Sequence, residues 1–180
     1  MKKILLLLII SCFSLSAFPK GPTPAASPRV DQMIADWERA KAYTKEYLDA
    51  ASEEAVNFKP SPEMRSFAEQ MLHLAMGSQG IVATSTGKDI LFKANIEKME
   101  QYKNKEALTK VVMESYDFVI GILKTLDDQK LDEPVKFFNG QTYTRGTGIS
   151  KAFEHQTHHR GQTTVYLRLK GITPPGEKLF

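Results

Sequence analysis

The sequence is poor in the residues and motifs that most often carry enzyme chemistry. Its 180 residues include a single cysteine, Cys12, so cysteine catalysis, thiolate metal sites and internal disulfide bonds are excluded for the rest of the chain. It contains no P-loop, no strand-to-helix GxGxxG pattern, no internal repeat and no low-complexity segment. The roughly 155 residues that follow the N-terminal segment are enough for one domain with a substantial core.

A large excess of one charge sign is missing as well. The chain has 24 Lys and Arg residues against 21 Asp and Glu residues, a formal charge of +3 at pH 7. Lys2 and Lys3 supply two of these three charges, and both lie in a segment that we expect to be removed. Because the remaining domain is almost neutral, its charge gives no support for a nucleic-acid partner.

The N-terminal segment has the pattern of a secretory signal. Lys2 and Lys3 give it a positive start, residues 4–10 form a continuously apolar run, and small residues follow over 11–17. This run is too short to span a bilayer as a permanent helix. We therefore predict that residues 1–17 are a signal peptide and that the protein is exported to the bacterial envelope.

Two kinds of processing fit this segment, and the sequence leaves both open. Cleavage near Ala17 would release a periplasmic protein, whereas the run IISC, ending at Cys12, resembles a lipoprotein signal whose cysteine becomes lipidated. An uncleaved membrane anchor is a third, less favoured interpretation. We expect contact with the membrane only through the signal peptide or a lipid anchor. Residues 18–27, rich in Pro, Ala and Gly, follow as a flexible spacer, and the folded domain covers residues 28–180.

Four long segments carry apolar residues at helical spacing. The first begins with Ser27 as N-cap and Pro28 at the first helical position, which is a favoured pair. The last stops at Gly171 and has basic residues in its final turn. The sequence therefore predicts helices over residues 27–51, 61–75, 104–126 and 147–170.

Two of the connections have patterns of their own. The stretch 85–103 is long, and residues 94–102 predict a short helix within it. Residues 135–144 predict a β-hairpin, because Asn139-Gly140 favours a type I′ turn and strand-forming residues flank it. The expected fold is all-α, an antiparallel four-helix bundle with a short β-hairpin insertion between helices three and four.

Histidine is scarce, with four residues in the chain, and two of them form a pair. His155 and His159 are spaced i, i+4, so on a helix both imidazoles lie on one face and can reach a single ion. The pair alone is weak support for a site, because such spacing arises by chance on solvated helices. Its face looks semi-buried, and Gly161 within the helix costs about 1 kcal/mol relative to Ala. A glycine at such a position indicates close packing or a nearby ligand.

His73 lies in the second helical segment, on the side opposite its apolar stripe. That side carries mostly small and polar residues, namely Ser66, Glu69, Gln70, Met76, Gly77 and Gly80. Periodicity leaves two interpretations open: an exposed histidine, or a histidine that borders a cavity where the glycines give room for an ion. Glu69, one turn earlier, could orient the imidazole or be a solvated charge.

The residues around these histidines resemble a known family. The run FEHQTHHRGQTTVYLRLKGITPPG, residues 153–176, is similar to the C-terminal motif of the DinB-like superfamily of metal-binding four-helix proteins. The run NFKPSPEMRSFAEQMLHLA, residues 57–75, resembles the earlier segment of that family, which presents one histidine. The resemblance spans residues 30–175.

By this resemblance the protein binds a divalent metal ion. The implied ligands are His73, His155 and His159. The resemblance gives His158 no ligand role, and it gives Arg160 and Gln162 orienting or helix-contact roles. For Tyr166, a hydrogen bond into the cavity and a packing role both stay open.

The implied site has three neutral imidazoles and a remaining coordination position. Such a donor set suits zinc or nickel, and the open position separates a catalytic or ligand-binding site from a closed structural one. The resemblance therefore implies a metal-dependent enzyme of transferase or hydrolase type that acts on a small molecule, and a homodimer. Relatives that transfer low-molecular-weight thiols are a weaker guide, because an exported protein would not ordinarily meet the cytoplasmic thiol pool. The alternative is a non-catalytic metal-binding or small-ligand-binding module.

Overall fold

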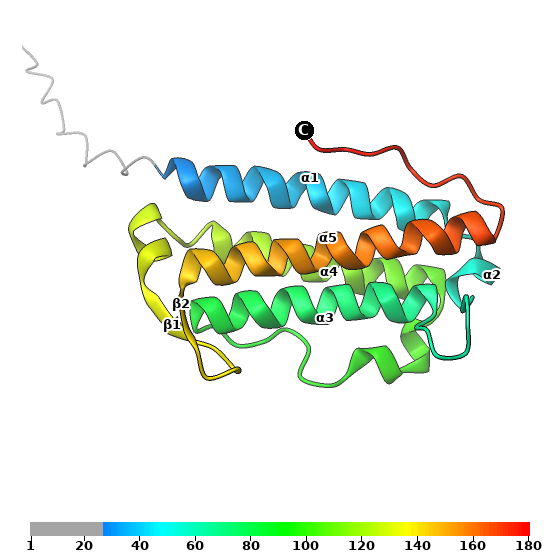
Figure 1. Cartoon of the computed structure of the whole chain (residues 1–180), viewed down its shortest axis with the longest axis horizontal. Helices are drawn as coiled ribbons and strands as arrows, with labels where there is room; N and C mark the ends of the chain where they lie inside the picture. The colour runs from blue at the N-terminus through cyan, green and yellow to red at the C-terminus, as the bar shows by residue number, and fades with distance from the viewer. Residues whose placement is uncertain (1–26) are drawn as a thin grey trace, which may run out of the picture.

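Four long helices form the bundle that the sequence predicts. The computed structural model describes residues 27–180, so the predicted signal peptide and almost all of the predicted spacer lie outside the described residues. The long helices are α1 (Pro28–Ala50), α3 (Phe67–Thr86), α4 (Lys105–Leu123) and α5 (Arg145–Leu169), shown in Figure 1. The connections hold α2 (Glu53–Val56), the 3-10 helices η1 (Ile96–Lys98), η2 (Glu100–Tyr102) and η3 (Asp128–Asp132), and the strands β1 (Pro134–Lys136) and β2 (Thr142–Thr144). The all-α bundle with its short hairpin is confirmed.

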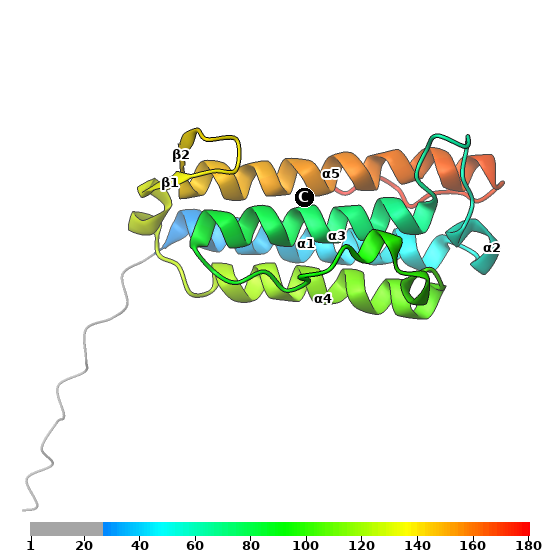
Figure 2. The same cartoon turned by 90° about the horizontal axis from the view of Figure 1, so that it is seen from below.

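The four helices lie around the bundle axis in the order α1, α4, α3, α5. Figures 1 and 2 show that α1 and α5 run in one direction and α3 and α4 in the other. The α1–α4 and α3–α5 pairs are therefore antiparallel, and the other two neighbouring pairs are parallel. The cause is the long connection 87–104, which carries the chain back along the bundle before α4 begins. The arrangement places α3 and α5 side by side over their full length, and all four histidines lie on these two helices.

Helix α3 begins later than the sequence pattern predicts. The turn signal at Ser61 does not start the helix; Ser66 caps it instead, with its side chain accepting from the Glu69 amide while Glu69 accepts from the Ser66 amide. This reciprocal capping box satisfies two amides at the helix start. Lys59 and Lys103 also pair with Glu69, at 3.1 and 3.2 Å. Burial would raise the pKa of Glu69, but these hydrogen bonds outweigh it and lower the pKa to about 2.

The hairpin between α4 and α5 is present, but its turn is not of type I′. A type I′ turn needs a positive φ at both central residues, and only Gly140 has one, at 80°. The Gly140 amide donates to the Phe137 carbonyl, and the Phe137 amide donates to the Gln141 carbonyl, both at 2.9 Å. This pattern is a three-residue loop closed by a left-handed glycine. The strands pair in antiparallel register, with Val135 opposite Tyr143.

A buried polar network fixes α5 against the rest of the core. Gln156 Oε1 accepts from Arg160 Nη1 at 2.9 Å and from the Tyr116 hydroxyl at 2.8 Å. The Arg160 guanidinium lies over the ring of Tyr43, 4.5 Å from its centroid, so Arg160 has the helix-contact role that the motif implied. Trp37 packs edge-on against Tyr116 in the apolar core. These contacts set the rotation of α5 about its axis, and that rotation turns His155 and His159 toward α3.

Among the described helices, none has the length and apolar character to cross a membrane.

Candidate metal centre

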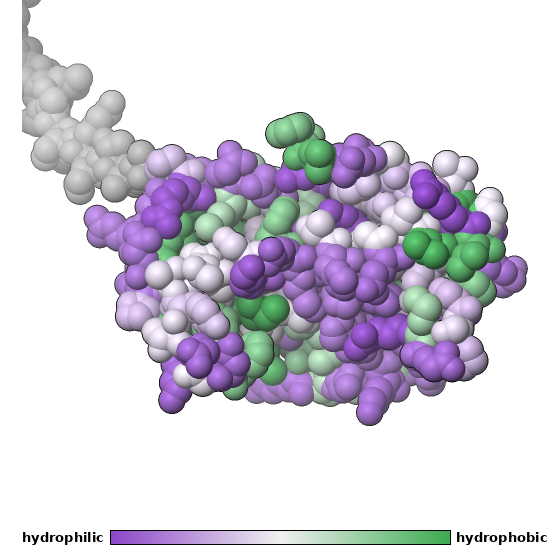
Figure 3. Space-filling model, in the orientation of Figure 1, coloured by the Kyte–Doolittle hydropathy of each residue, from purple (hydrophilic) through white to green (hydrophobic). Residues whose placement is uncertain are grey.

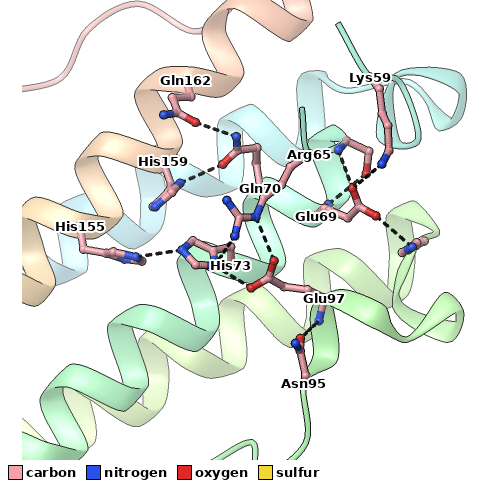
Figure 4. Close-up of polar contacts among 12 residues, drawn as sticks. Lys59, Arg65, Glu69, Gln70, His73, Asn95, Glu97, His155, His159 and Gln162 are labelled. Atoms are coloured by element: carbon pink, nitrogen blue, oxygen red, sulfur yellow. Dashed lines mark hydrogen bonds and ion pairs between the residues drawn. The ribbon is translucent and has the colours of Figure 1, made fainter. Parts of the chain in front are cut away.

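Three of the four histidines converge between α3 and α5, as Figure 4 shows. His73 comes from α3, and His155 and His159 come from α5, one turn apart. One ring nitrogen from each residue lies within 4.8 Å of the other two, and the Nε2 atoms of His73 and His155 are 3.4 Å apart. The ring centroids lie between 4.5 and 5.2 Å from one another. Periodicity left open whether His73 is simply exposed or borders a cavity. The structure shows its ring facing His155 and His159.

A carboxylate from the connection between α3 and α4 orients His73. The Nδ1 atom of His73 lies 2.6 Å from Glu97 Oε1, and Arg65 Nε donates to Glu97 Oε2 at 2.9 Å. Burial would raise the pKa of Glu97, but the hydrogen bonds from His73 and Arg65 lower it, so the carboxylate is an acceptor only. Arg65 Nη2 also lies 3.2 Å from His73 Nδ1, but the shorter contact with the ionised Glu97 requires a proton on Nδ1. His73 therefore donates from Nδ1 to Glu97, and its Nε2 is directed at the other histidines. The suggestion that Glu69 orients His73 is wrong, because the capping box and two lysines occupy Glu69.

A glutamine network orients His159. Gln70 Oε1 lies 2.8 Å from His159 Nδ1, while Gln70 Nε2 donates to Gln162 Oε1 at 2.6 Å and to the Tyr166 hydroxyl at 3.2 Å. Because the amide nitrogen of Gln70 has two acceptors, its oxygen must face the imidazole, which makes His159 Nδ1 the donor. The Nε2 of His159 is then free of any proton. Tyr166 is buried and donates to the Arg65 carbonyl at 2.9 Å, so it supports the network from the core.

His155 is held mainly by shape, and its one polar contact within residues 27–180 is the 3.4 Å approach of its Nε2 to His73 Nε2. Its ring lies directly against the backbone of Gly77 on α3, where a Cβ atom would come within 2.1 Å of Cε1 and 2.5 Å of Nε2. Its Nδ1 is buried and has no hydrogen-bond partner within residues 27–180. The sequence suggested that Gly77 gives room for an ion. In the structure, the missing side chain of Gly77 gives room for the His155 ring instead. Gly80 borders open space and does not contribute.

Burial keeps the two α5 imidazoles neutral. Burial lowers the pKa of His155 to about 4, and charge on His73 adds to the effect. Burial also lowers the pKa of His159 to about 3, with further repulsion from His155 and His73. At neutral pH both rings therefore carry a free lone pair, which is the form that binds metal ions.

The donor set fits a divalent cation. The proton positions above direct lone pairs of His73 and His159 at the same small volume, and His155 adds a nitrogen 3.4 Å from that of His73. Such an arrangement of lone pairs is repulsive unless a proton or cation lies among them. Imidazole nitrogens that share a tetrahedral zinc ion at about 2.0–2.1 Å lie about 3.4 Å apart.

Two further residues of the α5 motif have no part in this cluster. His158 is exposed, and its Nε2 accepts from Gln162 Nε2 at 2.7 Å, so this nitrogen faces Gln162 and not the cluster. Gly161 is exposed, and a Cβ atom there would meet nothing within 4 Å, so the expectation of close packing is wrong. It lines a separate groove of about 770 Å³ between α1, α5 and the C-terminal segment, on the side of α5 away from the histidines.

Comparisons with known proteins agree with this architecture. The model of the DinB family matches residues 25–179. The chain belongs to the DinB family. It is 26% identical over 148 residues to YrdA of Bacillus subtilis, an uncharacterized protein, and the match covers 82% of this chain and 86% of YrdA.

Solved structures show the same fold as this DinB-family protein. A DinB-like protein from Bacillus cereus superposes with a TM-score of 0.72 at 19% identity, covering 82% of this chain and 97% of the other. YfiT from Bacillus subtilis, described as a probable metal-dependent hydrolase with an unusual four-helix bundle topology, gives a TM-score of 0.62 at 15% identity. That match covers 84% of this chain and 93% of YfiT.

The role of Glu97 in this DinB-family protein can be measured directly. We expect Glu97→Gln to weaken zinc binding by roughly 10–100-fold, because loss of the charged partner of a ligating histidine has that effect. Glu100→Gln is the matched control, since Glu100 lies in the same connection but is exposed and, within the described part of the chain, pairs with Lys103 alone. Competition with a chromogenic chelator gives both affinities. Equal affinities in the two variants would show that Glu97 does not support the site.

Proposed function

We propose that this protein binds a divalent metal ion through His73, His155 and His159 and is a metal-dependent hydrolase of a small molecule. The observation that carries the proposal is the convergence of three ring nitrogens from two helices within 4.8 Å. Neutral imidazoles suit zinc and nickel among other transition-metal ions, and we propose one of these two. A cation held there supplies Lewis acidity, which polarises a carbonyl or phosphoryl oxygen of a substrate.

The residues around the histidines prepare the site for this task. Glu97 holds the Nδ1 proton of His73, and Gln70 holds that of His159, so each ring presents Nε2. The side chain of His73 is 28% exposed, which leaves the cluster within reach of a small molecule from the solvent. The description of YfiT as a probable metal-dependent hydrolase favours hydrolysis over group transfer. The signal-like pattern of residues 1–17 supports a location in the cell envelope.

One observation favours a second function, a metal-binding or ligand-binding module without catalysis. Hydrolysis by a metal site generally needs a base that accepts a proton from water. The carboxylate that contacts the histidines, Glu97, is already engaged by His73 and Arg65. A module that binds an anionic small molecule at the metal would not need such a base.

An activity screen separates the two functions. The zinc-loaded and nickel-loaded proteins are assayed with p-nitrophenyl esters, amino-acid p-nitroanilides and a thiol with an electrophilic acceptor. We expect hydrolysis that chelation removes, that zinc or nickel restores, and that His159→Ala lacks. Transfer of the thiol in place of hydrolysis would assign the transferase class. Stoichiometric metal binding without turnover of any substrate would support the module.

A further inference from the structure

A second surface feature lies on the same α3–α5 seam as the histidines. The β-hairpin folds over the start of α5 and leaves a groove of about 240 Å³ between itself and the two helices. The groove is lined mainly by apolar groups, from Ile81, Phe137, Phe138, Tyr143, Gly148 and the stem of Lys151. In Figure 3 an apolar patch lies over the C-terminal half of α3, beside the hydrophilic surface at the centre of the same face.

The groove lies one helical turn from the histidine cluster on both helices. On α5, Lys151 stands one turn before His155, and on α3, Ile81 stands one turn after Gly77, against which the His155 ring packs. At about 1.5 Å per residue, the groove therefore begins roughly 6 Å from the histidines along the helix axes. A molecule of ordinary substrate size can occupy both.

The walls of the groove are built to stay in place. A Cβ atom on Gly148 would come within 2.3 Å of Phe137 Cζ and 2.2 Å of Ser85 Oγ, so the glycine lets the hairpin dock closely on α5. Phe137 packs edge-on against Tyr143, with 5.6 Å between ring centroids. At the hairpin tip, Asn139 Nδ2 donates to the Tyr143 hydroxyl at 3.3 Å. Such a preformed wall loses little entropy when it binds a ligand.

The hairpin nevertheless presents apolar surface to the solvent. Phe138 is 83% exposed and Tyr143 is 41% exposed, both beside the groove. Among residues 27–180, Lys151 is the one cation that lines the groove, and it pairs with Glu154 at 2.7 Å. Large exposed aromatic side chains around a concave apolar surface are typical of a ligand site.

We propose that this groove is the apolar subsite of the histidine centre and takes a single aryl ring or short alkyl chain of the substrate. The substrate is then an amphipathic small molecule whose reacting polar group lies at the histidines. The volume of the groove is sufficient for such a group, because a cavity of about 150 Å³ already binds benzene. The inference rests on the proposed metal site and names the substrate class of that site.

Hydroxamates test the subsite without any need for turnover. Acetohydroxamate and 4-phenylbutyrohydroxamate carry the same metal-chelating head, and only the second has a chain that reaches the groove. We expect the zinc-loaded protein to bind the phenyl compound at least tenfold more tightly, measured by isothermal titration calorimetry. In Phe138→Ser the gain should fall below about threefold, whereas Leu169→Ser, which changes another exposed apolar side chain at the far end of α5, should keep it.

The outcomes separate the subsite from the metal site. If acetohydroxamate binds but the phenyl chain adds no affinity, the subsite is wrong and the metal site stands. The same conclusion follows if the added affinity of the phenyl compound is unchanged in Phe138→Ser. If neither hydroxamate binds, the metal site is wrong, and the metal-free protein is titrated with 4-phenylbutanol while the methyl resonances of Ile81 are followed by NMR. A saturable shift of these resonances that Phe138→Ser removes would support the groove as a ligand site. No shift would overturn it.

Discussion

We expect His155→Ala and His159→Ala each to abolish tight metal binding, and His158→Ala to leave it unchanged. Each of the first two removes one of three converging nitrogens, and the loss should exceed the roughly 10–100-fold effect of changing a residue that only supports a ligand. His158 is the matched control, because it is a neighbouring histidine on the same helix whose ring points to Gln162. Calorimetric titration of each purified variant with zinc measures the difference.

Thermal unfolding gives a second readout of the same variants. A ligand that binds only the folded protein stabilises it by about 2.7 kcal/mol at a free concentration one hundred times its dissociation constant. We expect zinc to raise the unfolding temperature of the wild type and of His158→Ala, but not of His155→Ala or His159→Ala. Comparing each variant with its own metal-free form removes any direct effect of the substitution on packing. The same response in all three variants would show that the wrong face of α5 was assigned.

We expect Gly77→Ala to weaken metal binding without removing any of the three proposed ligands. The new methyl group would occupy the position of the His155 ring, at 2.1 Å from Cε1, so the ring has to swing away from His73. The fold tolerates this movement, since a side-chain ring gives way and alanine is favoured over glycine within a helix by about 1 kcal/mol. We expect zinc affinity to fall by roughly 10–100-fold, as when a ligand is misplaced, with metal-free stability unchanged or slightly higher.

Gly80→Ala is the control for that substitution. Gly80 lies on the same helix one turn further on, and an added Cβ atom meets nothing within 4 Å. It should gain the same helix stability and keep full zinc affinity. Chemical denaturation and chelator competition measure the two quantities separately. If both glycine variants bind zinc like the wild type, the contact between Gly77 and His155 has no role in the site.

The sequence predicts those parts of the site that depend on helical periodicity. The i, i+4 spacing puts His155 and His159 on one face, and the small residues around His73 indicate a face that another group can approach. The structure brings all three together and uses Gly77 for that close approach. Their assignment as metal ligands stays a prediction that the experiments above test.

The supporting residues could not be found in the same way. Glu97 lies in the connection where the sequence predicted a short helix over residues 94–102, but that pattern does not say which part of the bundle it contacts. The return path of residues 87–104 along α3 brings Glu97 to His73. The one local signal is Asn95, whose side chain accepts from the Glu97 amide and starts η1. Glu69 had the right spacing from His73, but the competing capping box with Ser66 determines its position. Side-chain competition of this kind cannot be read from spacing.

The type of turn in the hairpin and the position of Gly161 show the same limit. Asn139-Gly140 is typical of a type I′ turn, yet the hydrogen bonds of Phe137 select a three-residue loop. That loop lets Phe137 dock beside Gly148 while Phe138 stays exposed at the groove. Gly161 resembled a packing glycine, but α5 turns it away from α3. Each outcome depends on tertiary contacts between elements distant in sequence.

Anomalous X-ray diffraction from crystals of the zinc-loaded protein tests the central claim most directly. Data collected on both sides of the zinc absorption edge place the ion without reference to any assumed ligand. The account predicts one strong peak between α3 and α5, within bonding distance of one nitrogen each from His73, His155 and His159. A peak at any other position, or one bonded to the α5 pair while His73 turns to the solvent, would contradict it.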